Sequence, residues 1–404
     1  MSLFSKMFGT KDSSGNATGE PPKGDFVAAL ATHLGGELDA ALTLYQRLVE
    51  ESPDATLAPF FAAAIKAGKG NTAEAVESLR ALSRQVSTTG DSLTRAIVLE
   101  LAAQVEDNAL IPIPAVAEII VSFGELLKRE GFIQESAVCF ELAAGYSPDN
   151  ANVLHKLGDT LHDLRMYDYA ESVLLGAIQC APYHWGALYT YAVLLQDLGR
   201  DQEAISYYER AVRLNPDHAK CQNNFGAALL RTNRLEEALD HCSQAAHLDP
   251  SSPLVKINLG NIYLLMQQYE KARNSFTEAL ALNNLMPEAY FGLASTEQAL
   301  EGEPGRIKEL YFKAIAINPS LAEAHHALGK LLALEGNADA LAHFAAAAQV
   351  NGNLQNLRRD FGTACLQLGR REEGVELLRA ALKQNPDDTV AQEILAKVEA
   401  DQQA

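Results

Sequence analysis

The sequence predicts an all-α protein built from repeated helix pairs. Three observations lead to this prediction. The chain is rich in alanine, leucine and glutamate and only 7% of its residues are aromatic, a composition that favours helices over a β-sandwich or a barrel. Small residues recur at intervals of 34 residues. Proline recurs near the end of most intervals, where it ends a helix because it lacks an N–H.

Glycine and alanine carry the recurrence of small residues. Gly226 lies in a stretch with helical periodicity, although a glycine inside a helix costs about 1 kcal/mol relative to alanine. Gly124, Gly158 and Gly260 lie at multiples of 34 residues from it, and Ala192 fills the gap. Small residues follow at fixed distances of twelve and nineteen residues, namely Ser136, Ala170, Ala204, Ala238 and Ala272, then Ala143, Ala177, Ala211, Ala245 and Ala279. Small residues let two helix axes approach closely, so Gly226 is expected to lie where a second helix crosses at Ala238.

These recurrences divide residues 117–388 into eight repeats. Their bounds are 117–150, 151–184, 185–218, 219–252, 253–286, 287–321, 322–354 and 355–388. Counted from the first residue of a repeat, small residues occupy positions 8, 20 and 27, a large residue occupies position 24 in most repeats, and proline occupies position 32 in most. This combination resembles the tetratricopeptide repeat family, which implies an all-α, right-handed superhelical solenoid of antiparallel helix pairs. Position 4 departs from the family pattern, which often has tryptophan or tyrosine there, because only Tyr290 fits it in this chain.

Three further segments flank the repeats. Residues 1–24 are predicted to be a disordered tail, because they are mostly glycine, serine, proline and charged residues. Residues 25–116 are predicted to form degenerate helical repeats plus a connecting helix at 92–106, and residues 389–404 a C-terminal capping helix. Within the tail, residues 3–8 leave two interpretations open: an unstructured end, or a short amphipathic anchor with one lysine opposite its apolar face.

Charge and cysteine content restrict the functional class. The formal net charge is −19, which argues against nucleic acid as a partner and favours a protein or peptide partner with basic residues. Five cysteines without a CxxC pair indicate free thiols in a reducing, cytoplasmic compartment. No run of 18 apolar residues is present, so no transmembrane helix is expected. The sequence contains no phosphate-binding glycine loop, serine-nucleophile motif or zinc-protease motif, so we expect neither a cofactor nor an enzyme activity.

The family resemblance implies a concave groove lined by the first helix of each repeat, at positions 2, 5, 6, 9, 12 and 13. The residues implied as peptide-binding are His155, Asp159, His162, Tyr189, Gln196, Lys220, Asn223, Asn224, Arg231, Asn258 and Asn261. Asn224 and Asn258 both occupy position 6, which looks partly like the asparagine ladder in the repeat arm of O-linked N-acetylglucosaminyltransferases, here without a catalytic domain. Side-chain amides both donate and accept hydrogen bonds, so they suit a peptide backbone. That these two amides are simply solvated polar positions stays open as an alternative.

Histidines raise the question of a metal site. His155, Asp159 and His162 share one helix face at i, i+4 and i+7, a spacing that suits metal ligands. We favour the simpler interpretation, a polar groove lining without metal, because no fourth ligand is evident in the sequence nearby. His325 and His326 are adjacent and point to different faces, and both are expected at the surface.

Together these features predict a non-enzymatic scaffold or adaptor that binds a partner protein or peptide in the groove formed by residues 151–286. Two other functions stay open. One is a substrate-recognition subunit that works with a separate glycosyltransferase or another modifying enzyme. The other is a self-assembling scaffold at a membrane or organelle, in which residues 3–8 supply a weak membrane contact or a contact between copies.

Overall fold

The computed structural model describes residues 37–51, 57–69, 71–89, 113–129 and 133–400, together with residues 29, 32 and 131. The chain divides into two compact units, one ending at Asn215 and the other beginning at Pro216. Every regular element in these described ranges is a helix. The first compact unit contains α3 (Leu38–Glu51), α4 (Leu57–Gly68), α5 (Thr72–Thr89), α7 (Ile113–Arg129), α8 (Ile133–Tyr146), α9 (Ala151–Asp163), α10 (Tyr167–Cys180), α11 (Trp185–Asp197) and α12 (Asp201–Leu214).

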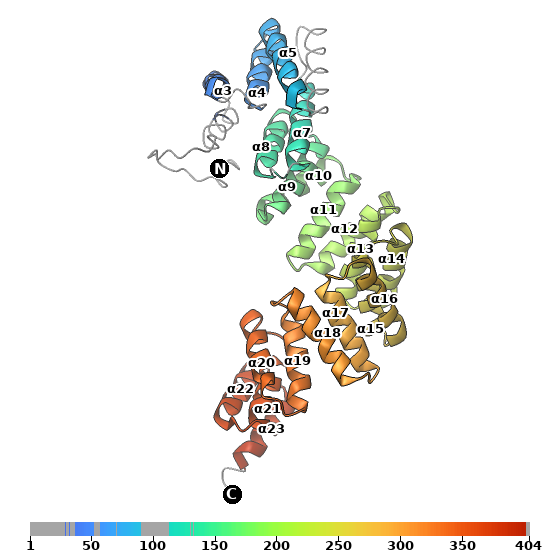
Figure 1. The fold of residues 1–404 in the computed structure, drawn as a ribbon. Coiled ribbons are helices and arrows are strands. Elements are labelled where there is room, and N and C mark those ends of the chain that lie inside the picture. The colour runs from blue at the N-terminus through green and yellow to red at the C-terminus, as the bar shows by residue number, and fades with distance from the viewer. Residues whose placement is uncertain are drawn as a thin grey trace. The chain divides into compact units, whose positions relative to one another are not determined.

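The second compact unit consists of five helix pairs of the same architecture, followed by one closing helix. It contains α13 (Ala219–Arg231), α14 (Leu235–Leu248), α15 (Pro253–Leu265), α16 (Tyr269–Leu282), α17 (Pro287–Ala299), α18 (Pro304–Ile317), α19 (Ala322–Leu334), α20 (Asp339–Val350), α21 (Leu357–Gln367), α22 (Arg371–Gln384) and α23 (Thr389–Ala400). Within each compact unit, consecutive helices pack against each other in pairs (Figure 1). The predicted all-α fold of sequential helix pairs is confirmed.

The two helices of a pair have different neighbours. The first helices, called A helices below, are α7, α9, α11, α13, α15, α17, α19 and α21, and the second helices, called B helices, are α8, α10, α12, α14, α16, α18, α20 and α22. Besides its own B helix, an A helix contacts the next A helix in the same compact unit, as α13 does with α15 and α15 with α17. The A helices of a compact unit therefore form one layer.

The close crossing inside most pairs occurs at a glycine of the A helix, and alanine takes that place at Ala192 and Ala294. A Cβ atom on Gly158 would lie 2.5 Å from Cγ of Leu174, and one on Gly226 would lie 2.4 Å from Sγ of Cys242. The backbone oxygen of Ala238 is 3.2 Å from the same point at Gly226. The expected crossing at Gly226 is confirmed, but its nearest atom belongs to Cys242, one turn beyond Ala238, because the side chain at position 24 fills the gap that the glycine leaves.

Position 24 forms the centre of each pair's core. Its occupants are at most 1% exposed in all eight pairs from α7 to α22, namely Phe140, Leu174, Tyr208, Cys242, Phe276, Tyr311, Phe344 and Leu378. Complete burial of a large apolar side chain contributes roughly 1.5–3 kcal/mol relative to exposure. The repeat pattern thus places one strongly buried side chain in each pair.

A left-handed residue follows each A helix from α7 to α21. Position 15 has φ between 55° and 88° in all eight of these pairs, at Gly131, Arg165, Gly199, Asn233, Gln267, Glu301, Gly336 and Gly369. A left-handed residue at a helix C-terminus lets backbone N–H groups reach the last carbonyls and turns the chain sharply. Four of the eight are not glycine, so the sequence does not mark this turn consistently.

Helices α3, α4 and α5 use the same small and large positions. Ala41, Tyr45, Ala63, Ala75 and Leu79 are each at most 1% exposed. The predicted tail with its segment 3–8, and the connecting helix at 92–106, lie outside the described residues. The division of the chain into four segments stays a prediction.

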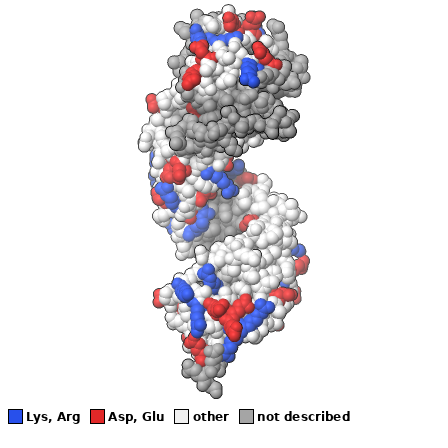
Figure 2. Space-filling model, turned by 90° about the vertical axis from the view of Figure 1, so that its left-hand side faces the viewer, with Lys and Arg blue, Asp and Glu red and all other residues white. Residues whose placement is uncertain are grey.

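The molecular surface mixes both signs of charge. On the face shown in Figure 2, acidic and basic side chains lie next to one another. Ion pairs one helical turn apart contribute to this mixture, such as Arg200 with Glu203 and Arg234 with Glu237. Among the described helices, none combines the length and apolar character needed to cross a bilayer.

Replacing Gly158 with alanine is expected to destabilise the first compact unit by about 1–3 kcal/mol, because the new methyl group would overlap the buried Leu174. Gly176 on α10 of the same pair is the matched control, since a Cβ atom there would meet only Cδ1 of Leu154 at 3.8 Å. Gly176→Ala should stabilise by about 0.5–1 kcal/mol, because alanine restricts the unfolded chain. Urea unfolding followed by circular dichroism measures both variants, and equal effects would contradict the close crossing at Gly158.

Candidate functional site

The polar side chains predicted to line the groove connect neighbouring A helices to one another. A side chain at position 5 bonds to one at position 6 of the next repeat: Nε2 of His155 shares a 3.1 Å hydrogen bond with Oγ1 of Thr190, Asn258 donates to Asn223 at 2.9 Å, and His326 bonds to Asp360 at 2.9 Å. A second set joins position 12 to position 13, through Lys128 with Asp163 and His162 with Asp197, each at 2.7 Å. We call these contacts the inter-repeat ladder.

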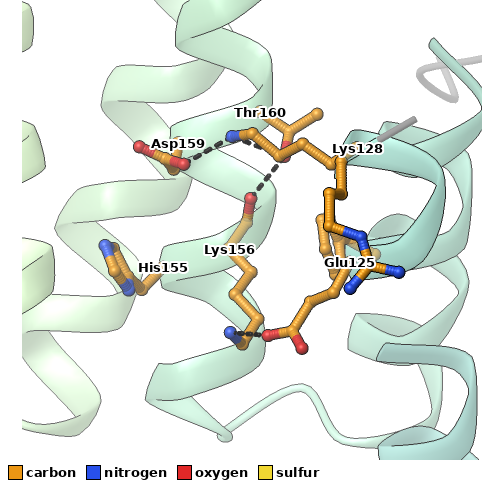
Figure 3. A pocket seen from close by; sticks show the side chains of 8 residues that line it. Glu125, Lys128, His155, Lys156, Asp159 and Thr160 are labelled. Atoms are coloured by element: carbon orange, nitrogen blue, oxygen red, sulfur yellow. Dashed lines mark hydrogen bonds and ion pairs between the residues drawn. The ribbon is translucent and has the colours of Figure 1, made fainter. Parts of the chain in front are cut away.

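A pocket of 340 Å³ lies beside this ladder in the first compact unit (Figure 3). It is lined by side chains of α7, α8 and α9, namely Glu125, Lys128, Arg129, Phe140, His155, Lys156, Asp159 and Thr160. Figure 3 shows Lys128 reaching across to Asp159 and Lys156 reaching back to Glu125. The two lysines and two carboxylates therefore neutralise each other pairwise, and the pocket carries no large excess of one charge.

Burial and charge set the protonation of two pocket residues. Burial lowers the pKa of His155 to about 4, so this imidazole is neutral at pH 7. Its ring lies against Gly186, where a Cβ atom would come within 2.7 Å of Cε1 of His155. Burial also acts to lower the pKa of Lys128, but the carboxylates of Asp159 and Asp163 outweigh it and raise that pKa. Lys128 is therefore a charged cross-link between α7 and α9.

The three residues considered as metal ligands have three different partners. His155 bonds to Thr190, Asp159 pairs with Lys128, and His162 pairs with Asp197. Among the described residues, no group of three or more histidine, cysteine, aspartate or glutamate side chains is arranged to hold a metal ion. The shared helix face thus serves contacts between repeats.

Tyr189 and Gln196 of α11 support the buried side chain at position 24. The ring of Tyr189 lies 6.2 Å from that of Tyr208 and 6.4 Å from that of Trp185, measured between centroids. The hydroxyl of Tyr208 donates to Oε1 of Gln196. Both predicted site residues are half-buried, so each combines a packing role with exposure on the A-helix layer.

In the second compact unit, three asparagines form a chain of amides. Asn258 donates through Nδ2 to Oδ1 of Asn223 at 2.9 Å, and Asn223 donates through Nδ2 to Oδ1 of Asn224 at 3.4 Å. Asn223 is only 8% exposed, so it links the other two and is poorly placed to meet a ligand. Asn261 is half-buried, and Lys220 and Arg231 are exposed at the two ends of α13.

His325 does not lie at the surface, so that prediction is wrong for His325, whereas His326 is half-buried. His325 is 8% exposed; its Nε2 donates to the carbonyl of Pro319 at 3.2 Å, and its Nδ1 lies 3.0 Å from Nδ1 of His343. Gln222 makes the same pair of contacts, donating to Pro216 at 2.8 Å and meeting His241 at 2.7 Å. Both residues occupy position 4, where the family pattern has an aromatic residue. The spacing of proline followed six residues later by glutamine or histidine is the sequence signal for this contact, and it recurs at Pro386 and Gln392.

Comparisons with known proteins agree with the repeat architecture. Residues 189–253, 253–285 and 331–398 match family models of the tetratricopeptide repeat. A search of curated proteins gave no significant match. The partial likeness to the repeat arm of O-linked N-acetylglucosaminyltransferases stays a prediction.

Solved structures with a similar arrangement of helices include three that span different shares of the chain. YrrB, described as a TPR protein with an unusual peptide-binding site, is 27% identical over 46% of this chain and 96% of its own, with a TM-score of 0.36. A tetratricopeptide repeat protein from Parabacteroides merdae is 18% identical over 62% of this chain and 99% of its own, with a TM-score of 0.49. Yeast Tom70 is 15% identical over 94% of this chain and 89% of its own, with a TM-score of 0.46.

The His325–His343 pair is expected to make stability depend on pH. With both rings neutral, Nδ1–H of His343 donates to Nδ1 of His325, whereas a further proton would place two N–H groups against each other. Burial, and then the neighbouring His325, lower the pKa of His343. The folded state therefore binds fewer protons than the unfolded state, so this contribution is complete above the unfolded pKa of about 6.5 and decreases as pH falls toward the lowered folded pKa.

His325→Gln tests this expectation, because glutamine at the same position in Gln222 keeps both contacts without titrating. The variant should lose less thermal stability than the wild type between pH 7 and pH 5, measured by differential scanning calorimetry. Every other residue is the same in the two proteins, so the remaining contributions cancel in the comparison. Parallel pH curves for the two proteins would contradict the assigned role of the pair.

Proposed function

The chain is a tetratricopeptide repeat protein, and we propose that it is a non-enzymatic scaffold that binds a partner protein or peptide through the polar face of its A helices. Tetratricopeptide repeat proteins mediate binding of proteins and peptides, and repeat arrays use the extended concave surfaces that their stacking creates. Each compact unit has its own layer of A helices, and the predicted binding residues lie on α9 and α11 of the first and on α13 and α15 of the second.

The amide chain on α13 and α15 carries the proposal. Asn258 uses its Nδ2 for the bond to Asn223, which leaves its Oδ1 as an acceptor for a polar group of a bound segment. Because Asn223 is buried and bonded on both sides, it holds the amides of Asn224 and Asn258 in fixed orientations. Pre-oriented amides on neighbouring helices favour binding of a partner segment, since binding then orders fewer side chains.

Charge favours a partner with basic residues. The net charge of −19 attracts cationic segments over distances beyond direct contact. In the first compact unit, Asp163 and Asp197 are exposed at the ends of the A helices α9 and α11. Each uses Oδ2 in the inter-repeat ladder, so Oδ1 can meet a lysine or arginine side chain. All five cysteines are free thiols, which supports a reducing, cytoplasmic location for this scaffold.

The chemistry of the A-helix face supports binding without catalysis. His155, Asp159 and His162 are engaged in the inter-repeat ladder, and His155 with its lowered pKa is held neutral by burial. A catalytic acid or base needs access to a reacting group, whereas these groups hold neighbouring helices together. The same contacts keep the binding face in one conformation.

Affinity capture with paired variants tests the scaffold function. Full-length wild type and Asn224→Ala/Asn258→Ala are each used to capture proteins from source-cell lysate, followed by quantitative mass spectrometry. Specific partners should be reduced about tenfold or more in the variant, because several hydrogen bonds to the partner are lost at about 0.5–1.5 kcal/mol each. Ser243→Ala/Asn274→Ala, which changes exposed residues of the B helices α14 and α16, is the matched control.

Thermal unfolding of each variant must accompany the capture, since loss of Asn224 and Asn258 leaves the buried Asn223 with fewer partners. A groove variant that is folded and still captures every wild-type partner at full yield would overturn the assignment of this face. Equal losses in the groove variant and in the control variant would overturn it as well.

A further inference from the structure

Helix α15 exposes two leucines on the layer of A helices. Leu254 is 57% exposed and Leu265 is 56% exposed. They occupy positions 2 and 13, and α15 is the one A helix of the eight repeats with leucine at both positions. Most other repeats have charged or amide side chains there, such as Lys220 and Arg231 in the preceding repeat. Two large apolar side chains that remain in water gain free energy when a partner covers them.

The two leucines and two asparagines form a single stripe along α15. Leu254, Asn258, Asn261 and Leu265 are spaced at i, i+4, i+7 and i+11, which places them on one face of the helix. Val255, on another side of the helix, is buried in the core. The stripe ends are about 16 Å apart, at 1.5 Å per residue. It is apolar at both ends and carries amides in the middle.

Charged residues of opposite sign flank the stripe. Helix α13 packs on one side of α15 and helix α17 on the other. The exposed Lys220 and Arg231 of α13 occupy the same repeat positions as the two leucines, and the exposed Glu288 of α17 occupies the position of Leu254. A ligand lying along α15 therefore has basic side chains along one edge and an acidic side chain along the other.

We propose that this stripe docks an amphipathic helix of a partner protein, with leucine-sized side chains at both ends of its contact face. The inference rests on the proposed scaffold function and specifies the kind of partner for the α13–α17 face. A helix presents side chains at the same i, i+4, i+7 and i+11 spacing, so one row of the partner matches the stripe in length and period. The partner helix has acidic residues on the edge facing α13 and basic residues on the edge facing α17.

The amides in the middle give the contact its register. A polar side chain inside an apolar helix contact loses its water and requires a polar partner, so it selects one alignment. Asn258 and Asn261 therefore call for a polar residue at the centre of the partner's contact face. The leucines supply most of the binding free energy through burial, and the asparagines and flanking charges supply specificity.

A peptide selection on the full-length protein tests the docking stripe. The probe is a phage-displayed library of 18-residue helical peptides, and the best binders are resynthesised with a fluorescent label for anisotropy titration. Selected peptides should share two apolar residues eleven positions apart, a polar residue between them and acidic residues on one flank. Leu254→Lys/Leu265→Lys should weaken their binding at least about tenfold, because both burials are lost.

Leu285→Lys is the matched control, because Leu285 is 68% exposed in the turn before α17 and lies outside the stripe. It should change the affinity by less than about twofold. Since all three leucines are exposed, circular dichroism should show every variant folded. Peptides that bind the stripe variant and the wild type equally would overturn the docking stripe.

Two further outcomes separate this inference from the scaffold function. Peptides lost with Asn224→Ala/Asn258→Ala but retained with Leu254→Lys/Leu265→Lys would overturn the stripe while leaving the scaffold function in place. Sedimentation velocity tests whether a second copy of this chain occupies the stripe instead. A wild-type dimer that becomes a monomer in the stripe variant would show that it does, and would overturn the proposal of a partner helix.

Discussion

The close crossing of the two helices in each pair is the contact on which the remaining structure depends. At Gly362 and Gly374 the helices come so near that a Cβ atom on either residue would lie 2.9 or 2.8 Å from the backbone oxygen of the other. Elsewhere the space left by glycine is filled by the side chain at position 24, which is almost fully buried in every pair from α7 to α22. Because packed interiors tolerate little change in volume, this contact allows only a narrow range of helix separations.

A constant pair geometry has a direct consequence for the A-helix layer. When every pair is built alike, position 5 of one repeat meets position 6 of the next, and the bonds of His155, Asn258 and His326 to their neighbours repeat the same offset. The side chains differ in chemistry, but each is a polar group lying between two helices and is therefore required to find a partner there. The inter-repeat ladder is thus the polar counterpart of the apolar crossing inside each pair.

The fold can be predicted from the sequence because the small residues required by close helix packing recur at a fixed spacing. The candidate site can be predicted only in part. Glycine at position 8 has no other physical explanation than a close crossing, so its recurrence is informative. The left-handed turn at position 15 escapes detection because Arg165, Gln267 and Glu301 adopt it as readily as glycine does in this context. The adjacent Asn223 and Asn224 look equivalent in the sequence. Only the packing of α15 against α13 shows that Asn223 is buried and bonded to Asn258.

The positions engaged in the ladder also determine where recognition of a partner can differ between repeats. Side chains at positions 5 and 12 contact the neighbouring A helix, so substitutions there change the packing between repeats as well as any ligand contact. Positions 2 and 13 lie at the helix ends and remain exposed in α13 and α15, and they vary from Lys220 and Arg231 to Leu254 and Leu265. Substitutions at such sites cost little stability, so charge or apolar area can vary there without loss of the fold. If the A-helix layer binds a partner as proposed, this variation at positions 2 and 13 is what would set the partner preference, and the central amides would set the register of the bound segment.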